Sequence, residues 1–128
     1  MPAQITLKRV YDPADPEDGV RILVDRLWPR GVSKERAALD RWAKDAAPSA
    51  ELRQRWHADP DAHLPDRFAA FAADYRAELA QGPAEAELAR LAELARTHPK
   101  LSLLYGARDP RVNHAVVLRD ALLARLAE

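Results

Sequence analysis

The sequence contains no cysteine, which excludes thiol catalysis, disulfide bonds and thiolate metal sites. Glycine is scarce, with four residues, and no glycine-rich phosphate loop or Gly-x-Ser-x-Gly nucleophile elbow is present. No run of about 18 apolar residues occurs, and the N-terminus has no apolar signal core. We therefore expect a cytoplasmic protein that has no membrane-spanning segment and does not act at a membrane.

The sequence also lacks any excess of charge of one sign. It has 20 basic and 20 acidic side chains, so no global field attracts nucleic acid or a membrane surface. The charge is nevertheless uneven along the chain. Residues 21–36 contain five basic and two acidic side chains, whereas residues 57–96 contain four basic and eight acidic ones. A basic face formed by 21–36 is therefore expected on a neutral protein.

The length and the hydrophobic pattern predict an α/β protein. At 128 residues and 48% hydrophobic, the chain is expected to form a single domain, 1–128, with its own core. Apolar runs predict an edge strand over 5–10 and buried strands over 20–27 and 101–105. Helical spacing and caps predict helices over about 34–40, 50–56, 68–79, 84–95 and 110–126. This order favours a three-layer α/β/α domain with a small, mainly parallel sheet.

Two boundaries in this pattern need comment. Segment 41–45 fits either the end of the preceding helix or a short third strand. For the last helix, we expect Asp109 as the N-cap with Pro110 in the first turn.

Charged side chains follow two of the predicted strands. Asp25 and Arg26 lie at the end of the 20–27 strand and Arg30 follows it, and Arg108 comes after the 101–105 strand. Ligands of parallel sheets bind at the carboxyl ends of the strands, so we expect one shared pocket there. Arginine binds phosphate and carboxylate groups bidentately, and the pocket is therefore expected to hold an anionic, phosphate- or nucleotide-containing small molecule.

Further residues are assigned to the same pocket. His114, near the start of the last helix, and Asp25, at the end of a strand, are the candidate catalytic residues, because either type of side chain can act as an acid or base. The sequence pattern assigns no reaction and no cofactor to this pocket. The candidate ligand-binding residues are Arg26, Arg30, Lys44, Ser49, Arg53, Tyr105, Arg108 and Asn113.

Other interpretations of these residues stay open. Arg26 and Arg30 fit equally well as structural ion-pair partners of Asp25 or Asp45, and for Asp25 a structural pair with arginine is favoured. The basic 21–36 segment is the alternative basis for a nucleic-acid-binding or regulatory module, which zero net charge disfavours. A non-catalytic partner-binding domain is the third alternative. His57, Asp59, Asp61 and His63 match no zinc-ligand spacing, so no metal site is assigned.

Four blocks of the sequence carry a family resemblance. They are LKRVYD at 7–12, VDRLWPRG at 24–31, WAKDAAPS at 42–49 and LLYGARD at 103–109. In this order they resemble the YeaO-like branch of a bacterial family called domain of unknown function 488, over about residues 5–123. The resemblance implies a compact α/β domain and assigns no activity. The broader family often has Cys-His-Arg near the start of its last helix, where this chain has Asn113-His114-Ala115, so thiol chemistry does not transfer.

Overall fold

The computed structural model describes residues 3–128 and confirms the α/β class. Its elements are β1 (Gln4–Arg9), η1 (Pro16–Asp18), β2 (Val20–Leu23), α1 (Lys34–Ala37), β3 (Arg41–Trp42), η2 (Lys44–Ala46), α2 (Ala50–Ala58), α3 (Pro65–Leu79), α4 (Gly82–Thr97), β4 (Lys100–Tyr105) and α5 (His114–Leu126). The predicted order of strands and helices is correct. Of the two possibilities for 41–45, the strand is the one formed.

The four strands form a parallel sheet in the order β1-β4-β2-β3. β4 lies between β1 and β2, with Leu103 opposite both Leu7 and Ile22. This position explains why Leu101–Tyr105 is buried throughout, whereas β1 is an edge strand as predicted. Because the strands are parallel, β2 and β4 end at the same edge of the sheet.

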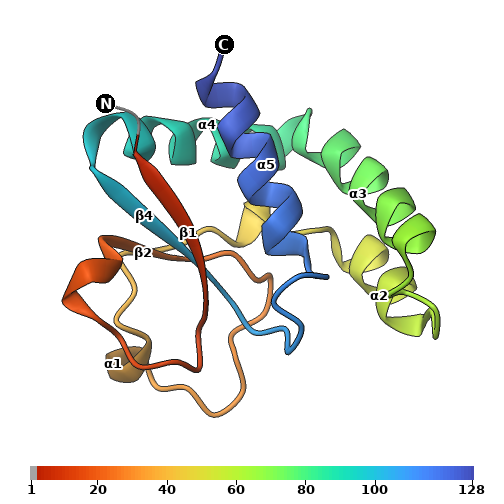
Figure 1. Cartoon of the computed structure of the whole chain (residues 1–128), viewed down its shortest axis with the longest axis horizontal. Helices are drawn as coiled ribbons and strands as arrows, with labels where there is room; N and C mark the ends of the chain where they lie inside the picture. The colour runs from red at the N-terminus through yellow and green to blue at the C-terminus, as the bar shows by residue number, and fades with distance from the viewer. Residues whose placement is uncertain (1–2) are drawn as a thin grey trace.

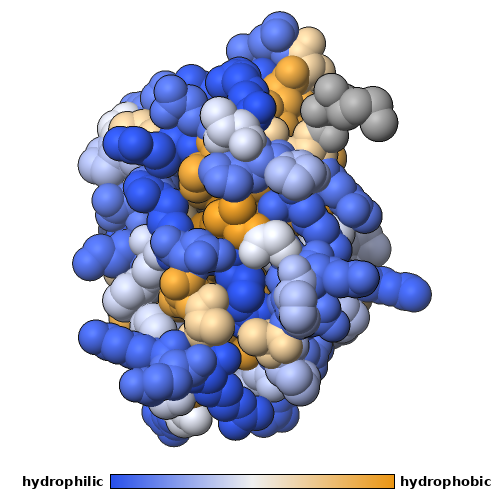
Figure 2. All heavy atoms as spheres, turned by 90° about the vertical axis from the view of Figure 1, so that its left-hand side faces the viewer, coloured by the Kyte–Doolittle hydropathy of each residue, from blue (hydrophilic) through white to orange (hydrophobic). Residues whose placement is uncertain are grey.

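The two faces of the sheet are covered unequally. One face holds most of the core, where Val24 and Leu118 pack together with the apolar sides of α3, α4 and α5. The other face carries a small cluster of Val10, Leu23 and Leu104 beneath the chain around α1. Figure 1 shows α3, α4 and α5 grouped together and the single turn of α1 well apart from them. Seen from the side of η1 and α1, the surface is mainly hydrophilic with small separate apolar patches (Figure 2).

Three of the element boundaries that differ from the sequence predictions have a clear local cause. α1 begins after the predicted cap Ser33 but ends at Ala37 rather than near residue 40. The guanidinium of Arg21 donates to the carbonyls of Ala37 and Ala38, and Ala38 adopts a left-handed conformation with φ of 47°. These bonds hold the chain in a turn where a further helical turn was expected.

β2 ends at Leu23, four residues before the predicted end. The Asp25 carboxylate accepts the hydrogen bond from the Gly106 backbone N–H at 2.9 Å. The Gly106 N–H therefore bonds to the Asp25 side chain and not to a backbone carbonyl of the neighbouring strand. The backbone hydrogen bonds between β2 and β4 stop at this point.

The predicted cap of α5 is wrong. Asn113, not Asp109, is the N-cap, and its Oδ1 accepts from the Val116 N–H at 3.1 Å. Asp109 instead accepts from the N–H groups of Arg111 and Val112 in the turn before the helix. Both residue types accept backbone bonds in turns, so their neighbours decide which one caps the helix.

The helices of the described residues, 3–128, include none that is long and apolar enough to cross a membrane.

Candidate ligand-binding site

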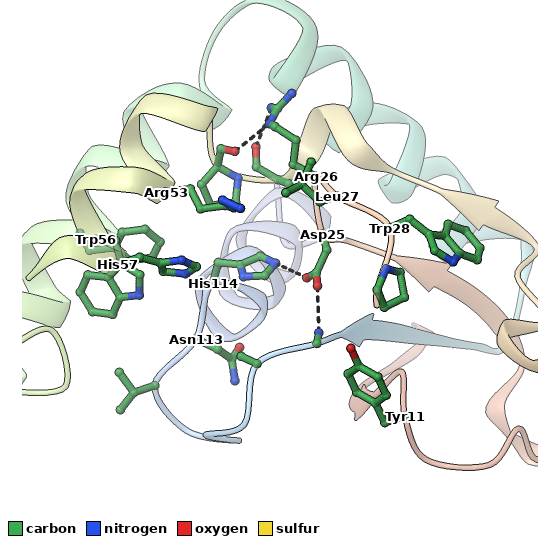
Figure 3. A pocket seen from close by; sticks show the side chains of 17 residues that line it. Tyr11, Asp25, Arg26, Leu27, Trp28, Arg53, Trp56, His57, Asn113 and His114 are labelled. Carbon is green, nitrogen blue, oxygen red and sulfur yellow. Dashed lines mark hydrogen bonds and ion pairs between the residues drawn. The ribbon is translucent and has the colours of Figure 1, made fainter. Parts of the chain in front are cut away.

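A cavity of about 320 Å³ opens at the carboxyl ends of β2 and β4 (Figure 3). We call it the strand-end pocket. Segments from five parts of the chain line it: Tyr11, residues 25–29, residues of 47–57, Phe71, and residues of 106–114. Its volume falls in the range of cavities that hold small ligands. The shared pocket predicted between the two strand ends is therefore present.

One wall of the strand-end pocket contains a carboxylate–imidazole pair. His114, the first residue of α5, has its Nε2 3.0 Å from Asp25 Oδ1 and 2.9 Å from the Val24 carbonyl oxygen. Both neighbours are acceptors, so we assign the proton to Nε2, which leaves Nδ1 as the ring nitrogen without a hydrogen-bond partner among residues 3–128. An imidazole oriented in this way offers one defined nitrogen to a ligand.

The two oxygens of Asp25 have different partners. Oδ2 accepts from the Gly106 N–H, whereas Oδ1 is buried and has no well-aligned hydrogen bond. The 3.0 Å contact with His114 Nε2 is close in distance, but that N–H is also directed at the Val24 carbonyl. We regard the contact as electrostatic, an ion pair when the imidazole is protonated, rather than as an aligned hydrogen bond.

Gly106 makes this arrangement sterically possible. A Cβ built at residue 106 would lie 3.0 Å from Asp25 Oδ2 and 3.8 Å from the ring of Tyr11. Arg9 fixes the same turn from the neighbouring strand, because its Nε donates to the Ala107 carbonyl at 2.9 Å. The end of β4 is thus held at the distance that the Asp25 carboxylate requires.

The opposite wall is supplied by α2. Arg53 and His57 are four residues apart and therefore lie on the same face of this helix, and both line the strand-end pocket. The pKa of His57 is lowered, first by burial and then by the positive charges of Arg53 and His114, against a smaller opposing effect of Asp25. Figure 3 shows His57 and His114 facing one another, with Arg53 beside them.

The rest of the lining is aromatic and apolar. Trp56 packs on Phe71 with ring centroids 4.4 Å apart, and both rings line the strand-end pocket. Trp28 lines another part of it and donates from its indole nitrogen to the Val32 carbonyl at 2.7 Å. The Tyr11 hydroxyl donates to the Arg30 carbonyl at 3.2 Å. These rings are fixed by their own contacts and form a preformed surface for an apolar or planar group.

Comparison with known proteins gives a consistent picture. A family model described as "Inactive DUF488-N3 subclade" matches residues 4–128. The chain belongs to the DUF488-N3 subclade described as inactive. The resemblance to the YeaO-like branch of this family is confirmed.

The relatives of this DUF488-N3 chain align along almost their whole length. Uncharacterized protein YeaO of Escherichia coli K12 is 51% identical over 118 residues, which cover 92% of this chain and 96% of YeaO. Uncharacterized protein Rv3073c of Mycobacterium tuberculosis H37Rv is 40% identical over 122 residues, or 95% of this chain and 96% of the relative. No solved structure matches the chain significantly.

The predicted site residues of this DUF488-N3 chain divide into two groups. The strand-end pocket is lined by Asp25, Arg26, Arg53, Asn113 and His114. It is not lined by Arg30, Lys44, Ser49, Tyr105 or Arg108.

Two of the five pocket residues have their polar groups engaged by the protein itself. Arg26 donates to the carbonyls of Ala47 and Pro48 at 3.2 and 2.9 Å, and Figure 3 shows its guanidinium turned toward them. Asn113 uses Oδ1 for the cap of α5 and Nδ2 for the Asp109 carbonyl. The expected arginine partner of Asp25 is wrong, because within residues 3–128 this carboxylate pairs with His114.

The residues outside the strand-end pocket have local roles or are exposed. Ser49 caps α2, and its N–H and hydroxyl both donate to the Glu78 carboxylate, at 2.8 and 2.6 Å. Lys44 lies over the Trp42 ring, 5.4 Å from its centroid. Tyr105 is buried, and this burial raises the pKa of its hydroxyl. Arg30 and Arg108 are exposed.

Sequence reasoning missed several lining residues, notably Tyr11, Trp56, His57 and Gly106. Helical spacing from Arg53 was the available signal for Trp56 and His57, which are three and four residues further along α2. His57 was considered only in a metal pattern. Within residues 3–128, no group of three or more His, Cys, Asp and Glu side chains is placed to hold a metal ion.

Proposed function

We propose that this protein is a single-domain binder of a small anionic molecule that contains a phosphate or a nucleotide, and that the ligand occupies the strand-end pocket. The observation that carries the proposal is the convergence of Arg53, His57 and His114 in one cavity with aromatic walls. Arginine and imidazole groups donate to anions, and aromatic rings bind planar or apolar groups. The location at the carboxyl ends of parallel strands also agrees with this function.

Binding is favoured over catalysis by the chemistry of the lining. Asn113 stands where the resemblance to the wider family places a cysteine, and both polar atoms of its side chain are occupied. The description of the matching subclade as inactive agrees with this substitution. In this proposal Asp25 and His114 are binding and positioning groups.

Acid–base catalysis is the second candidate, and the pairing of Asp25 with His114 is the observation that favours it. A small enzyme of this kind would turn over a phosphate ester at the strand-end pocket. Release of phenol from phenyl phosphate, abolished in His114→Gln, would establish this activity over simple binding.

Nucleic acid is the less favoured partner in this proposal. Of the five basic residues in 21–36, Arg21 is buried and Arg26 donates to backbone carbonyls. Arg30, Lys34 and Arg36 are left on the surface, which is a small patch for a phosphate backbone.

Calorimetry and thermal shift at low ionic strength test the proposal. The probes are inorganic phosphate, phenyl phosphate and adenosine monophosphate. We expect at least one to raise the melting temperature of the wild type, and salt to weaken its binding, because a ligand bound only to the native state stabilises it and ionic contacts are screened.

Two variants complete the test. Arg53→Gln should weaken binding about tenfold, because one charge-assisted contact is lost. Arg108→Gln, which changes an exposed arginine outside the strand-end pocket, is the matched control and should bind as the wild type does. A wild type that responds to none of the probes, or an Arg53→Gln protein that binds as tightly as the wild type, would refute the proposal.

A further inference from the structure

Donors approach the strand-end pocket from two sides. Arg53 and His57 project from the same face of α2, and His114 comes from the start of α5 (Figure 3). Within the described residues 3–128, the Arg53 guanidinium has no hydrogen-bond or ion-pair partner in the protein. His114 has its Nε2 engaged by Val24 and Asp25, so Nδ1 is the nitrogen available to a ligand, and the protonated imidazole donates from it to an anion. Three groups in two different walls are therefore ready to bind an anion.

We propose that the anionic group of the ligand is a terminal phosphate monoester, held between Arg53 and His57 on one wall and His114 on the other. This inference rests on the proposed binding function and specifies the class of ligand.

The number of free oxygens decides between the anions. A carboxylate has two acceptor oxygens in one plane, and a phosphate diester has two unesterified oxygens. A phosphate monoester has three, arranged tetrahedrally, and can accept from three donors that approach from different directions. It also carries close to two negative charges above pH 7, which suits a site with one arginine and two imidazoles. The negative charge of Asp25 repels an anion only weakly, because the Gly106 N–H and His114 already contact its two oxygens.

The environment of His57 gives the inference a measurable signature. Arg53, His114 and Asp25 are the charged or titratable groups that act on it, and its pKa is lowered by burial and by the first two. His57 is therefore largely neutral at pH 7.5 in the free protein. A dianion placed beside it favours the protonated imidazole. Binding of a monoester is thus expected to take up a proton, whereas binding of a singly charged anion takes up less.

Calorimetry at pH 7.5 with three probes that share a phenyl ring tests the inference: phenyl phosphate, methyl phenyl phosphate and benzoate. The monoester should bind about tenfold more tightly than the diester or the carboxylate. Repeating the titration in two buffers of different ionisation enthalpy measures the proton uptake. In His57→Gln the monoester should bind no more tightly than the diester, and the proton uptake should fall. His63→Gln, in an exposed histidine outside the strand-end pocket, is the matched control.

The possible outcomes separate the inference from the proposed function. Equal affinity for the three probes would overturn the inference and leave the proposed function standing. The same holds if the preference for the monoester survives in His57→Gln, because His57 would then not select the ligand. Failure of these three probes, of inorganic phosphate and of adenosine monophosphate to bind the wild type would overturn both.

Discussion

Two acidic side chains of this protein, the buried Asp18 and the half-buried Asp25, differ in how completely they are bonded. Asp18, beneath the chain around α1, accepts from Lys8 at 3.0 Å, from the Asp15 N–H at 3.0 Å and from the Arg21 guanidinium. Asp25 has an aligned hydrogen bond to one oxygen only. We call Asp18, Lys8 and Arg21 the Asp18 cluster. In this cluster the carboxylate is bonded to groups of the protein on both oxygens, whereas the carboxylate of Asp25 lies in the wall of the strand-end pocket.

The positive partners of the two carboxylates show the same difference. Arg21 is buried and directs its remaining N–H groups at the carbonyls of Ala37 and Ala38. Within the part of the chain that the structure describes, Nδ1 of His114 has no hydrogen-bond partner. Buried polar groups that are fully bonded stabilise one structure, and those left partly bonded are where ligands act. We therefore assign a structural role to the Asp18 cluster, whereas the Asp25 pair is part of the proposed binding site.

The largest effect on stability should come from disrupting the Asp18 cluster. Arg21→Met removes the main positive partner of Asp18 and leaves a buried carboxylate with Lys8 alone. We expect the free energy of unfolding to fall by about 3–5 kcal/mol, measured by urea denaturation. The double variant Asp18→Asn, Arg21→Met should recover part of the loss. If Arg21→Met costs less than about 1 kcal/mol, the cluster does not hold the α1 side of the sheet.

The same cluster should make stability depend on acid. Burial raises the pKa of Asp18, but hydrogen bonds from Asp15, Lys8 and Arg21 outweigh burial, and the pKa is lowered from its usual 3.8. The ionised carboxylate therefore stabilises the folded state fully above pH 3.8, and this contribution is lost as the pH falls through the lower folded-state pKa. In Asp18→Asn the free energy of unfolding should depend less steeply on pH in that acid range.

The next largest effect tests the apolar part of the α1 side. Leu104 is fully buried with Val10 and Leu23, on the face of the sheet that no long helix covers. Leu104→Ala should lower the free energy of unfolding by about 2–5 kcal/mol, because a cavity remains in a packed cluster. Leu118→Ala, on the helix-covered face, provides the comparison. A loss under about 1 kcal/mol at Leu104 would mean that this thin layer contributes little to stability.

A smaller effect is expected at the border of the strand-end pocket. Arg26→Ala leaves the carbonyls of Ala47 and Pro48 without their donor, and should cost about 1–3 kcal/mol of stability. Arg30→Ala, at an exposed position nearby, should change stability by less than about 0.5 kcal/mol. Equal stability of the two variants, combined with loss of anion binding in Arg26→Ala, would show that Arg26 binds the ligand and is not structural.

The smallest effect on stability should come from a change next to the Asp25–His114 pair. Gly106→Ala places a methyl group 3.0 Å from Asp25 Oδ2 and should cost about 1 kcal/mol as the carboxylate moves. Because His114 loses its fixed partner, phenyl phosphate should bind more weakly to this variant, as calorimetry can measure. Unchanged affinity would mean that the position of Asp25 does not matter for the ligand.

The sequence by itself determined the features that depend on near neighbours. Periods of two and 3.6 residues marked the strands and helices, and Ser33 and Ser49 marked the starts of α1 and α2. The strand-end placement of Asp25 and the start of α5 near His114 followed from the same local patterns, since parallel strands end at one edge. The position of the strand-end pocket was therefore predictable.

Only the tertiary structure decided which groups pair with one another. Arg26 and Arg53 look alike in the sequence, yet the guanidinium of the first bonds to backbone carbonyls and the second lines the strand-end pocket. Asp25 was expected to pair with an arginine close to it in the sequence and pairs instead with His114, a residue far along the chain. Hydrogen-bond partners are chosen by distances and angles in space, and a sequence pattern carries this information only for residues within a turn or two of one another.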